Sequence, residues 1–113
     1  MPPSLTAALY VAAGGGAGAL ARYLVGLAVS RAGLPSLAAT LVVNVLGCWA
    51  LGLLHAHTVD PRLRLLLGTG ALGGFTTFST FALDAHELGG AASAAYVLAS
   101  VGLGLAAFHL GRG

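Results

Sequence analysis

Charged residues are scarce in this chain, and the few that occur divide it into four long uncharged stretches. Only 7% of its 113 residues are charged, whereas a soluble domain has about 25%. A surface so poor in charge cannot face water, which excludes an ordinary cytosolic domain. Each stretch approaches the roughly 20 apolar residues that a helix needs to cross a bilayer. The uncharged stretches are residues 2–21, 32–59, 65–83 and 88–111.

This pattern predicts an all-α integral membrane protein in which residues 1–113 form a single four-helix membrane domain. Pro35 and Pro61 each suit the first turn of a helix, which helps to place the second and third spans. The spans use most of the chain, so we expect no soluble domain. We place the transmembrane helices at about 5–29, 35–57, 62–84 and 88–111.

The third span is unusual because glycine and β-branched residues interrupt its apolar pattern. Both residue types weaken a helix, and here they are concentrated in one segment. We therefore predict that the third helix is broken near the bilayer midplane. The residues concerned are Gly68, Gly70, Gly73 and Gly74, followed by Phe75-Thr76-Thr77-Phe78-Ser79-Thr80-Phe81.

Small residues recur in the spans at a spacing that lets helix backbones approach each other in lipid. The pairs Gly14/Gly18 and Gly70/Gly74 are examples. Tight packing of the helices is therefore expected.

The arginines give a weak orientation signal. With the N-terminus inside, Arg62, Arg64 and Arg112 are cytoplasmic and Arg31 is outside. This is a small bias under the positive-inside rule, so insertion in both orientations stays open.

Other function classes find little support in the sequence. Gly68 to Gly73 spell GxGxxG, but a dinucleotide site needs a preceding strand and an acidic residue about 20 positions further on. Here a membrane helix precedes the motif, and the region around Ser93 is uncharged. Five scattered arginines do not make the basic stripe of a nucleic-acid-binding protein. His55 and His57 point to different faces of a helix, which disfavours a transition-metal site. The acids lie at loop edges, so no catalytic group is identified and an enzyme is not expected.

Polar side chains at membrane depth are the main functional signal. Thr40 and Asn44 share one helix face, as do Tyr96 and Ser100. Polar groups in lipid are costly and usually face a bundle interior or a water-filled path. Hydrogen bonds that join helices, worth about 0.6 kcal/mol on average, are the alternative explanation.

Three phenylalanines, Phe75, Phe78 and Phe81, recur every third residue in the third span. By itself this spacing indicates core packing. Here, however, the rings alternate with hydroxyl residues. Aromatic ring edges are electropositive, so together with hydroxyl and amide donors they could replace the water shell of an anion.

These segments resemble the Fluc (CrcB) fluoride channel family along essentially the whole chain. Three successive spans carry matching motifs, and length and span count agree as well. The motifs are Gly14-Gly15-Gly16-Ala17-Gly18-Ala19 with Arg22-Tyr23, Thr40-Leu41-Val42-Val43-Asn44-Val45-Leu46-Gly47, and Gly70-Ala71-Leu72-Gly73-Gly74 followed by Phe75 to Phe81.

The resemblance implies an antiparallel, dual-topology homodimer in the plasma (inner) membrane, with two fluoride pores and one central sodium ion. The backbone carbonyls of Gly73 and Thr76 would hold the sodium. Arg22 and Asp84 would lie at a vestibule, although Arg22 could equally snorkel to the membrane interface. The residues implied for the pore and fluoride binding are Asn44, Phe78, Phe81, Thr80, Ser79, Tyr96 and Ser100.

Two positions depart from the pattern of that family. Gly104 stands where a further hydroxyl residue would continue the line of Tyr96 and Ser100. Asp84 stands where a glutamate is usual and is one methylene shorter.

The expected function is passive export of fluoride from the cytoplasm, which lowers intracellular fluoride and gives fluoride resistance. Two alternatives are a small multidrug-type transporter and a non-transporting membrane assembly subunit. The transporter would need a membrane-embedded carboxylate in the first span, and this chain has none there.

Overall fold

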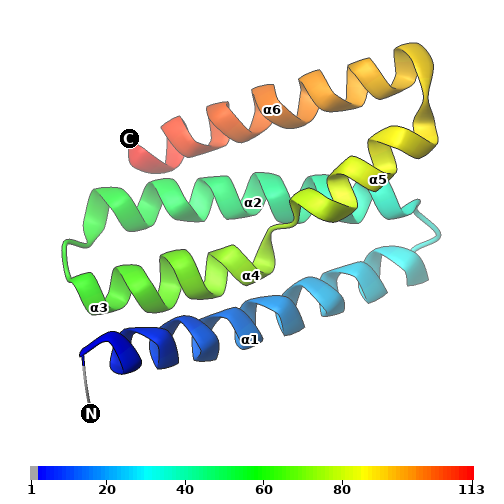
Figure 1. Cartoon of the computed structure of the whole chain (residues 1–113). Helices are drawn as coiled ribbons and strands as arrows, with labels where there is room; N and C mark the ends of the chain where they lie inside the picture. Colours follow the sequence, from blue (N-terminus) through cyan, green and yellow to red (C-terminus); the bar gives the residue numbers. More distant parts are fainter. Residues whose placement is uncertain (1–2) are drawn as a thin grey trace.

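The computed structural model describes residues 3–113, and the regular secondary structure of that range is entirely helical. Four helical rods lie side by side, with the third interrupted near its middle (Figure 1). Each rod is long and apolar enough to cross a membrane, which confirms the prediction of four spanning helices. The elements are α1 (Pro3–Arg31), α2 (Ser36–His57), α3 (Pro61–Leu63), η1 (Arg64–Leu72), α4 (Gly73–Phe75), α5 (Phe78–Leu88) and α6 (Gly90–Arg112).

Prolines mark the starts of the second and third rods, as expected. Pro61 occupies the first turn of α3, and the Asp60 side chain accepts a hydrogen bond from the Arg62 N–H at 2.9 Å. Pro35 lies one residue outside α2, where it forms the extended N-cap. In both places the fixed φ of proline suits the entry into a helix.

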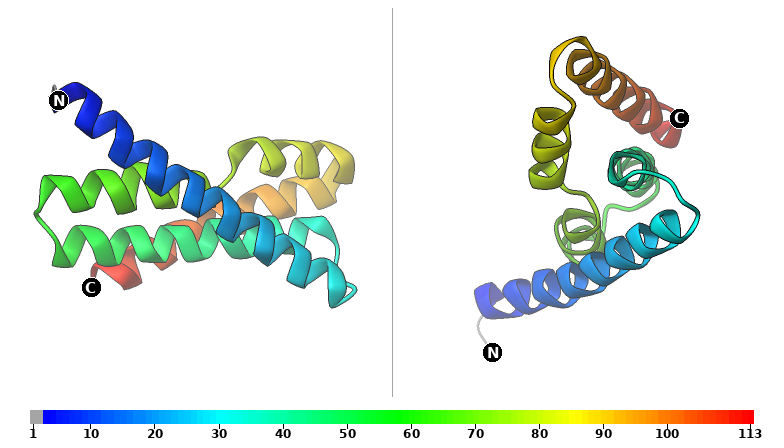
Figure 2. Two further views of the ribbon diagram at one scale, coloured as in Figure 1. Left: turned by 90° about the horizontal axis from the view of Figure 1, so that it is seen from below. Right: turned by 90° about the vertical axis from the view of Figure 1, so that its right-hand side faces the viewer.

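The third rod contains the predicted break. Its first half continues as the π-helix η1, in which the Gly73 N–H reaches back to the Gly68 carbonyl. Thr76 (φ −82°, ψ 161°) and Thr77 (φ −148°, ψ 117°) are then extended, and a new helix, α5, begins at Phe78. Figure 2 shows that α5 is displaced from the line of α4. Thr77 caps α5 by accepting a hydrogen bond from the Thr80 N–H at 3.2 Å.

Glycines allow the closest helix contacts. A Cβ on Gly14 would collide with the backbone at Leu66 and Ala71, and one on Gly18 would collide with the Ala71 carbonyl. A Cβ on Gly74 would meet the backbone of Gly15. The predicted tight packing is therefore confirmed, and the structure shows that it joins the first and third spans. α1 crosses the other rods at an angle (Figure 2), so this close contact is confined to η1 and α4.

Most large apolar side chains face outward. Among residues 3–113 the buried apolar side chains are Val43, Tyr96 and Ala107, whereas Leu98 is 73% and Leu110 is 77% exposed. An apolar surface of this kind suits lipid. Helices in a membrane protein are held together by close backbone packing and polar contacts and not by a large apolar core.

We predict that Gly18→Leu disrupts the bundle, because the added side chain has to displace the backbone of η1. Overpacking of this kind typically costs about 1–3 kcal/mol or more. Thermal unfolding in detergent, followed by size-exclusion chromatography, measures the effect. Gly16→Leu is the matched control, since nothing lies within 4 Å of a Cβ at Gly16. Equal melting temperatures for the two variants would contradict the close α1–η1 contact.

Candidate functional site at the helix break

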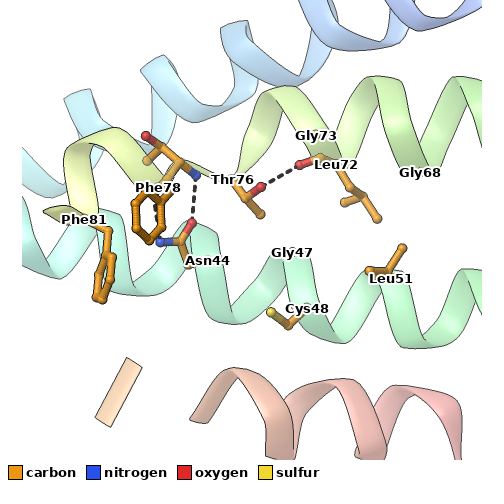
Figure 3. A pocket seen from close by; sticks show the side chains of 11 residues that line it. Asn44, Gly47, Cys48, Leu51, Gly68, Leu72, Gly73, Thr76, Phe78 and Phe81 are labelled. Carbon is orange, nitrogen blue, oxygen red and sulfur yellow. Dashed lines mark hydrogen bonds between the residues drawn. The ribbon is translucent and has the colours of Figure 1, made fainter. Parts of the chain in front are cut away.

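Asn44 of α2 is hydrogen-bonded to both backbone groups of Thr77, in the break of the third rod. Its side-chain N–H donates to the Thr77 carbonyl at 3.1 Å, and its Oδ1 accepts from the Thr77 N–H at 2.8 Å. Figure 3 shows the amide facing the extended segment from the α2 side. An amide side chain has two N–H groups, so one N–H of Asn44 is left for another acceptor.

The break releases main-chain carbonyls. In a continuous α-helix the Thr77 N–H would donate to Gly73 and the Thr80 N–H to Thr76. Here these two donors bind Asn44 Oδ1 and Thr77 Oγ1 instead. The carbonyls of Gly73 and Thr76 therefore lose their helical partners, and these are the two residues that the sequence analysis associates with a cation.

The hydroxyls at the start of α5 form a small cluster. Thr77 Oγ1 lies 3.2 Å from Ser79 Oγ and 3.3 Å from Thr80 Oγ1. Ser79 is exposed and Thr80 is half-buried. The cluster places hydroxyl groups beside the exposed ring of Phe78.

A row of aromatic rings leads from α5 to α6. The ring centroids of Phe78 and Phe81 are 5.7 Å apart, and those of Phe81 and Tyr96 are 5.3 Å apart. Phe78 is 78% exposed, so this end of the row is open within the single chain. The structure thus brings three of the predicted pore residues together.

The hydroxyls of Tyr96 and Ser100 are buried yet unsatisfied. Within residues 3–113 neither oxygen has a hydrogen-bond partner, and Tyr96 as a whole is 7% exposed. Buried hydroxyls without a partner are costly. The polar groups nearest to the Tyr96 hydroxyl are the side chains of Thr40, Asp84 and Ser100.

Asp84 is buried, which the sequence analysis did not anticipate. It is 7% exposed, and its Oδ2 accepts a hydrogen bond from Thr40 Oγ1 at 2.7 Å. The charge of Asp84 predicts that the third span ends at residue 84, whereas α5 continues to Leu88. The carboxylate is accommodated inside the bundle because Thr40 donates to it. The predicted shared face of Thr40 and Asn44 is the signal that points to this contact, since both side chains bind the third rod.

Arg22 contacts the third rod next to the break. Its Nε donates to the Gly74 carbonyl at 3.0 Å. The rest of the side chain lines a cavity of about 270 Å³ beside Thr40, Thr77 and Thr80.

A cavity of about 370 Å³ lies beside the break, between α2 and the third rod. Figure 3 shows Asn44, Phe78 and Phe81 at one end and Leu51 toward the other. The predicted pore residues Ser79, Thr80, Tyr96 and Ser100 are not among its lining residues. Those residues are Asn44, Gly47, Cys48, Leu51, Gly68, Leu72, Gly73, Thr76, Thr77, Phe78 and Phe81.

Gly104 lies against α2 and not over an open space. It is buried, and a Cβ there would lie 3.3 Å from Cys48 Sγ. The absence of a side chain at this position therefore lets α6 approach α2 closely.

Comparison with known proteins places the whole bundle in one family. The family model described as "CrcB-like protein, Camphor Resistance (CrcB)" matches residues 9–112. A fluoride-specific ion channel FluC from Rhizobium leguminosarum bv. trifolii is 47% identical over 114 residues, covering 92% of this chain and 91% of that protein.

Other relatives agree. Fluoride-specific ion channel FluC 2 from Rhodococcus jostii is 47% identical over 108 residues, which cover 91% of this chain and 93% of its own. A FluC from Rhodospirillum centenum is 50% identical over 102 residues, 81% of each chain. This chain has four helices that can span a membrane, and its relatives are ion channels. It is therefore a multi-pass membrane protein. The chain belongs to the CrcB family, whose matched relatives are fluoride-specific ion channels.

Proposed function

We propose that this protein is a fluoride-selective channel through which fluoride leaves the cytoplasm passively, lowering intracellular fluoride and giving fluoride resistance. Membership of a family whose matched relatives are fluoride-specific ion channels supports fluoride as the permeating ion. The observation that carries the proposal is the Phe78–Phe81–Tyr96 ring row next to buried hydroxyls that have no partner in residues 3–113.

Fluoride is small and strongly hydrated, so a pathway has to replace its water shell with short-range donors. The free N–H of Asn44 and the hydroxyls of Ser79, Thr80, Tyr96 and Ser100 are such donors. The ring edges of Phe78 and Phe81 add a positive electrostatic potential without a full charge. Conduction requires binding that is weak enough to release the ion, and uncharged donors meet that requirement.

The membrane potential supplies the driving force. A negative interior favours anion exit by about 2.3 kcal/mol per charge at 100 mV. A passive pathway therefore needs neither a nucleotide nor a proton relay.

The pathway is completed by a second copy of the chain, inserted in the opposite orientation. Phe78 is 78% exposed, and the cavity beside the break has one wall formed by α2 and the other by the third rod. Phe78 would be an uncovered pore wall in a monomer. An antiparallel, dual-topology homodimer would enclose two such pores.

A sodium ion at the dimer interface fits the released carbonyls of Gly73 and Thr76. Oxygen ligands suit a hard cation, and unwound backbone at membrane depth needs partners for its polar groups. Two carbonyls from each protomer would hold the ion and join the two broken rods. The ion would thereby hold the protomers together.

The non-transporting assembly subunit is the rival that experiment has to exclude. In that case the polar side chains would only join helices. A multidrug-type transporter would need a carboxylate in the first span, and α1 of this chain contains no acidic residue.

Fluoride efflux from liposomes that contain the purified protein tests the proposal. A fluoride electrode is expected to record rapid release after the potential is set with valinomycin, with negligible chloride release measured in parallel. Release of neither ion by a dimer that is intact in detergent would overturn it. Equal release of both ions would overturn the selectivity.

We also predict that Phe78→Leu and Phe81→Leu each reduce fluoride efflux by about tenfold or more, because leucine keeps a large apolar side chain but removes the electropositive ring edge. Phe108→Leu is the control, since Phe108 packs against His55 at the far end of the bundle. Size-exclusion chromatography reports the dimer for all three variants. Loss of the dimer together with flux would instead support the assembly subunit.

A further inference from the structure

Arg22 makes a polar contact between α1 and the end of α4. Its Nε donates to the Gly74 carbonyl at 3.0 Å across 52 positions of sequence. Gly15 and Gly18 lie on the same stripe of α1 as Arg22, and both contact the third rod through its backbone. The arginine therefore extends a line of backbone contacts to the last turn before the break.

This contact is favourable for both partners. The last carbonyls of a helix have no helical donors and carry partial negative charge, which a cation stabilises. A guanidinium at membrane depth, in turn, is costly unless it is paired. Gly74 lies in that last turn, because α4 ends at Phe75.

The contact also occupies one of the carbonyls that the break releases. The break removes the helical donors of Gly73 and Thr76, as described above, and Arg22 takes the Gly74 carbonyl that lies between them. With Gly74 held against α1, the unwound segment is fixed on one side by Arg22 and on the other by Asn44. The directions of the Gly73 and Thr76 carbonyls follow from these two anchors.

We propose that Arg22 is a positioning residue that sets the geometry of the broken helix through its Nε–Gly74 hydrogen bond, and that it does not act mainly as a positive charge for anions. The consequence for sodium and fluoride rests on the proposed function. The hydrogen bond and its effect on the fold do not.

Two variants separate the hydrogen bond from the charge. In Arg22→Gln the side-chain N–H₂ occupies the position of the arginine Nε, so the donor remains and the charge is lost. In Arg22→Lys the charge remains, but a methylene takes the place of Nε. Arg22→Met removes both. Arg31→Gln, at the exposed end of α1, is the matched control for loss of a charge.

Thermal unfolding of the detergent-solubilised dimer at fixed salt is the first readout. The proposal predicts that Arg22→Gln and Arg31→Gln melt close to the unsubstituted protein, while Arg22→Lys and Arg22→Met melt at lower temperature. If Arg22→Lys kept the melting temperature of the unsubstituted protein while Arg22→Gln melted at a lower temperature, the proposal would be overturned in favour of a role for the charge. Unchanged melting of Arg22→Met would overturn it as well.

The sodium midpoint is the second readout. It is taken from the rise in melting temperature when sodium chloride replaces N-methylglucamine chloride, and from fluoride efflux over the same range. Arg22→Lys and Arg22→Met are expected to raise the midpoint by about tenfold, the effect of one lost hydrogen bond to a charged group, whereas Arg22→Gln leaves it nearly unchanged. A general loss of folded protein would lower the maximal flux without moving the midpoint.

The two failures are distinguishable. If the unsubstituted protein conducts no fluoride, the proposed function fails, and the order of melting temperatures still decides the role of Arg22. If it conducts and every variant keeps the same sodium midpoint, the positioning role fails while the channel stands.

Discussion

The pair of hydrogen bonds between Asn44 and Thr77 is the interaction on which the rest of the structure depends. A broken helix inside a membrane exposes peptide groups that neither lipid nor water can satisfy at that depth. Asn44 presents a donor and an acceptor to the two groups of one residue, at 3.1 and 2.8 Å, and so replaces part of the lost helical pairing. Because of this anchor, α5 can begin again at Phe78 with its own cap.

Other features of the site follow from the position of the break. The restart at Phe78 sets the direction of α5, and thereby the register that brings Phe81 to Tyr96 at 5.3 Å. It also brings Asp84 to Thr40 at 2.7 Å. α2 thus makes two polar contacts with the third rod, through Thr40 and Asn44, which lie one turn apart. A rigid frame of this kind suits the recognition of an ion that has to exchange its water shell for fixed donors.

The sequence predicts the features that depend on local composition. Charge spacing identifies four spans, and the concentration of glycine and threonine after Gly68 identifies the break. Helical periodicity places Thr40 and Asn44 on one face but does not name their partners. Those partners, Asp84 and Thr77, lie 44 and 33 positions away, and only packing brings them close. The contact of Arg22 with Gly74 was missed for the same reason. Charge spacing alone predicts that Asp84 lies at a span end, whereas a carboxylate with a hydroxyl donor can be buried.

The most direct test of this account is fluoride efflux from liposomes that contain the Asn44→Asp variant. Aspartate keeps the size of asparagine and the acceptor for the Thr77 N–H, but it removes the donor for the Thr77 carbonyl and places a negative charge in the path. With the dimer intact in detergent, the account predicts a fall in efflux of about tenfold or more. Efflux equal to that of the unsubstituted protein would contradict the central role of Asn44.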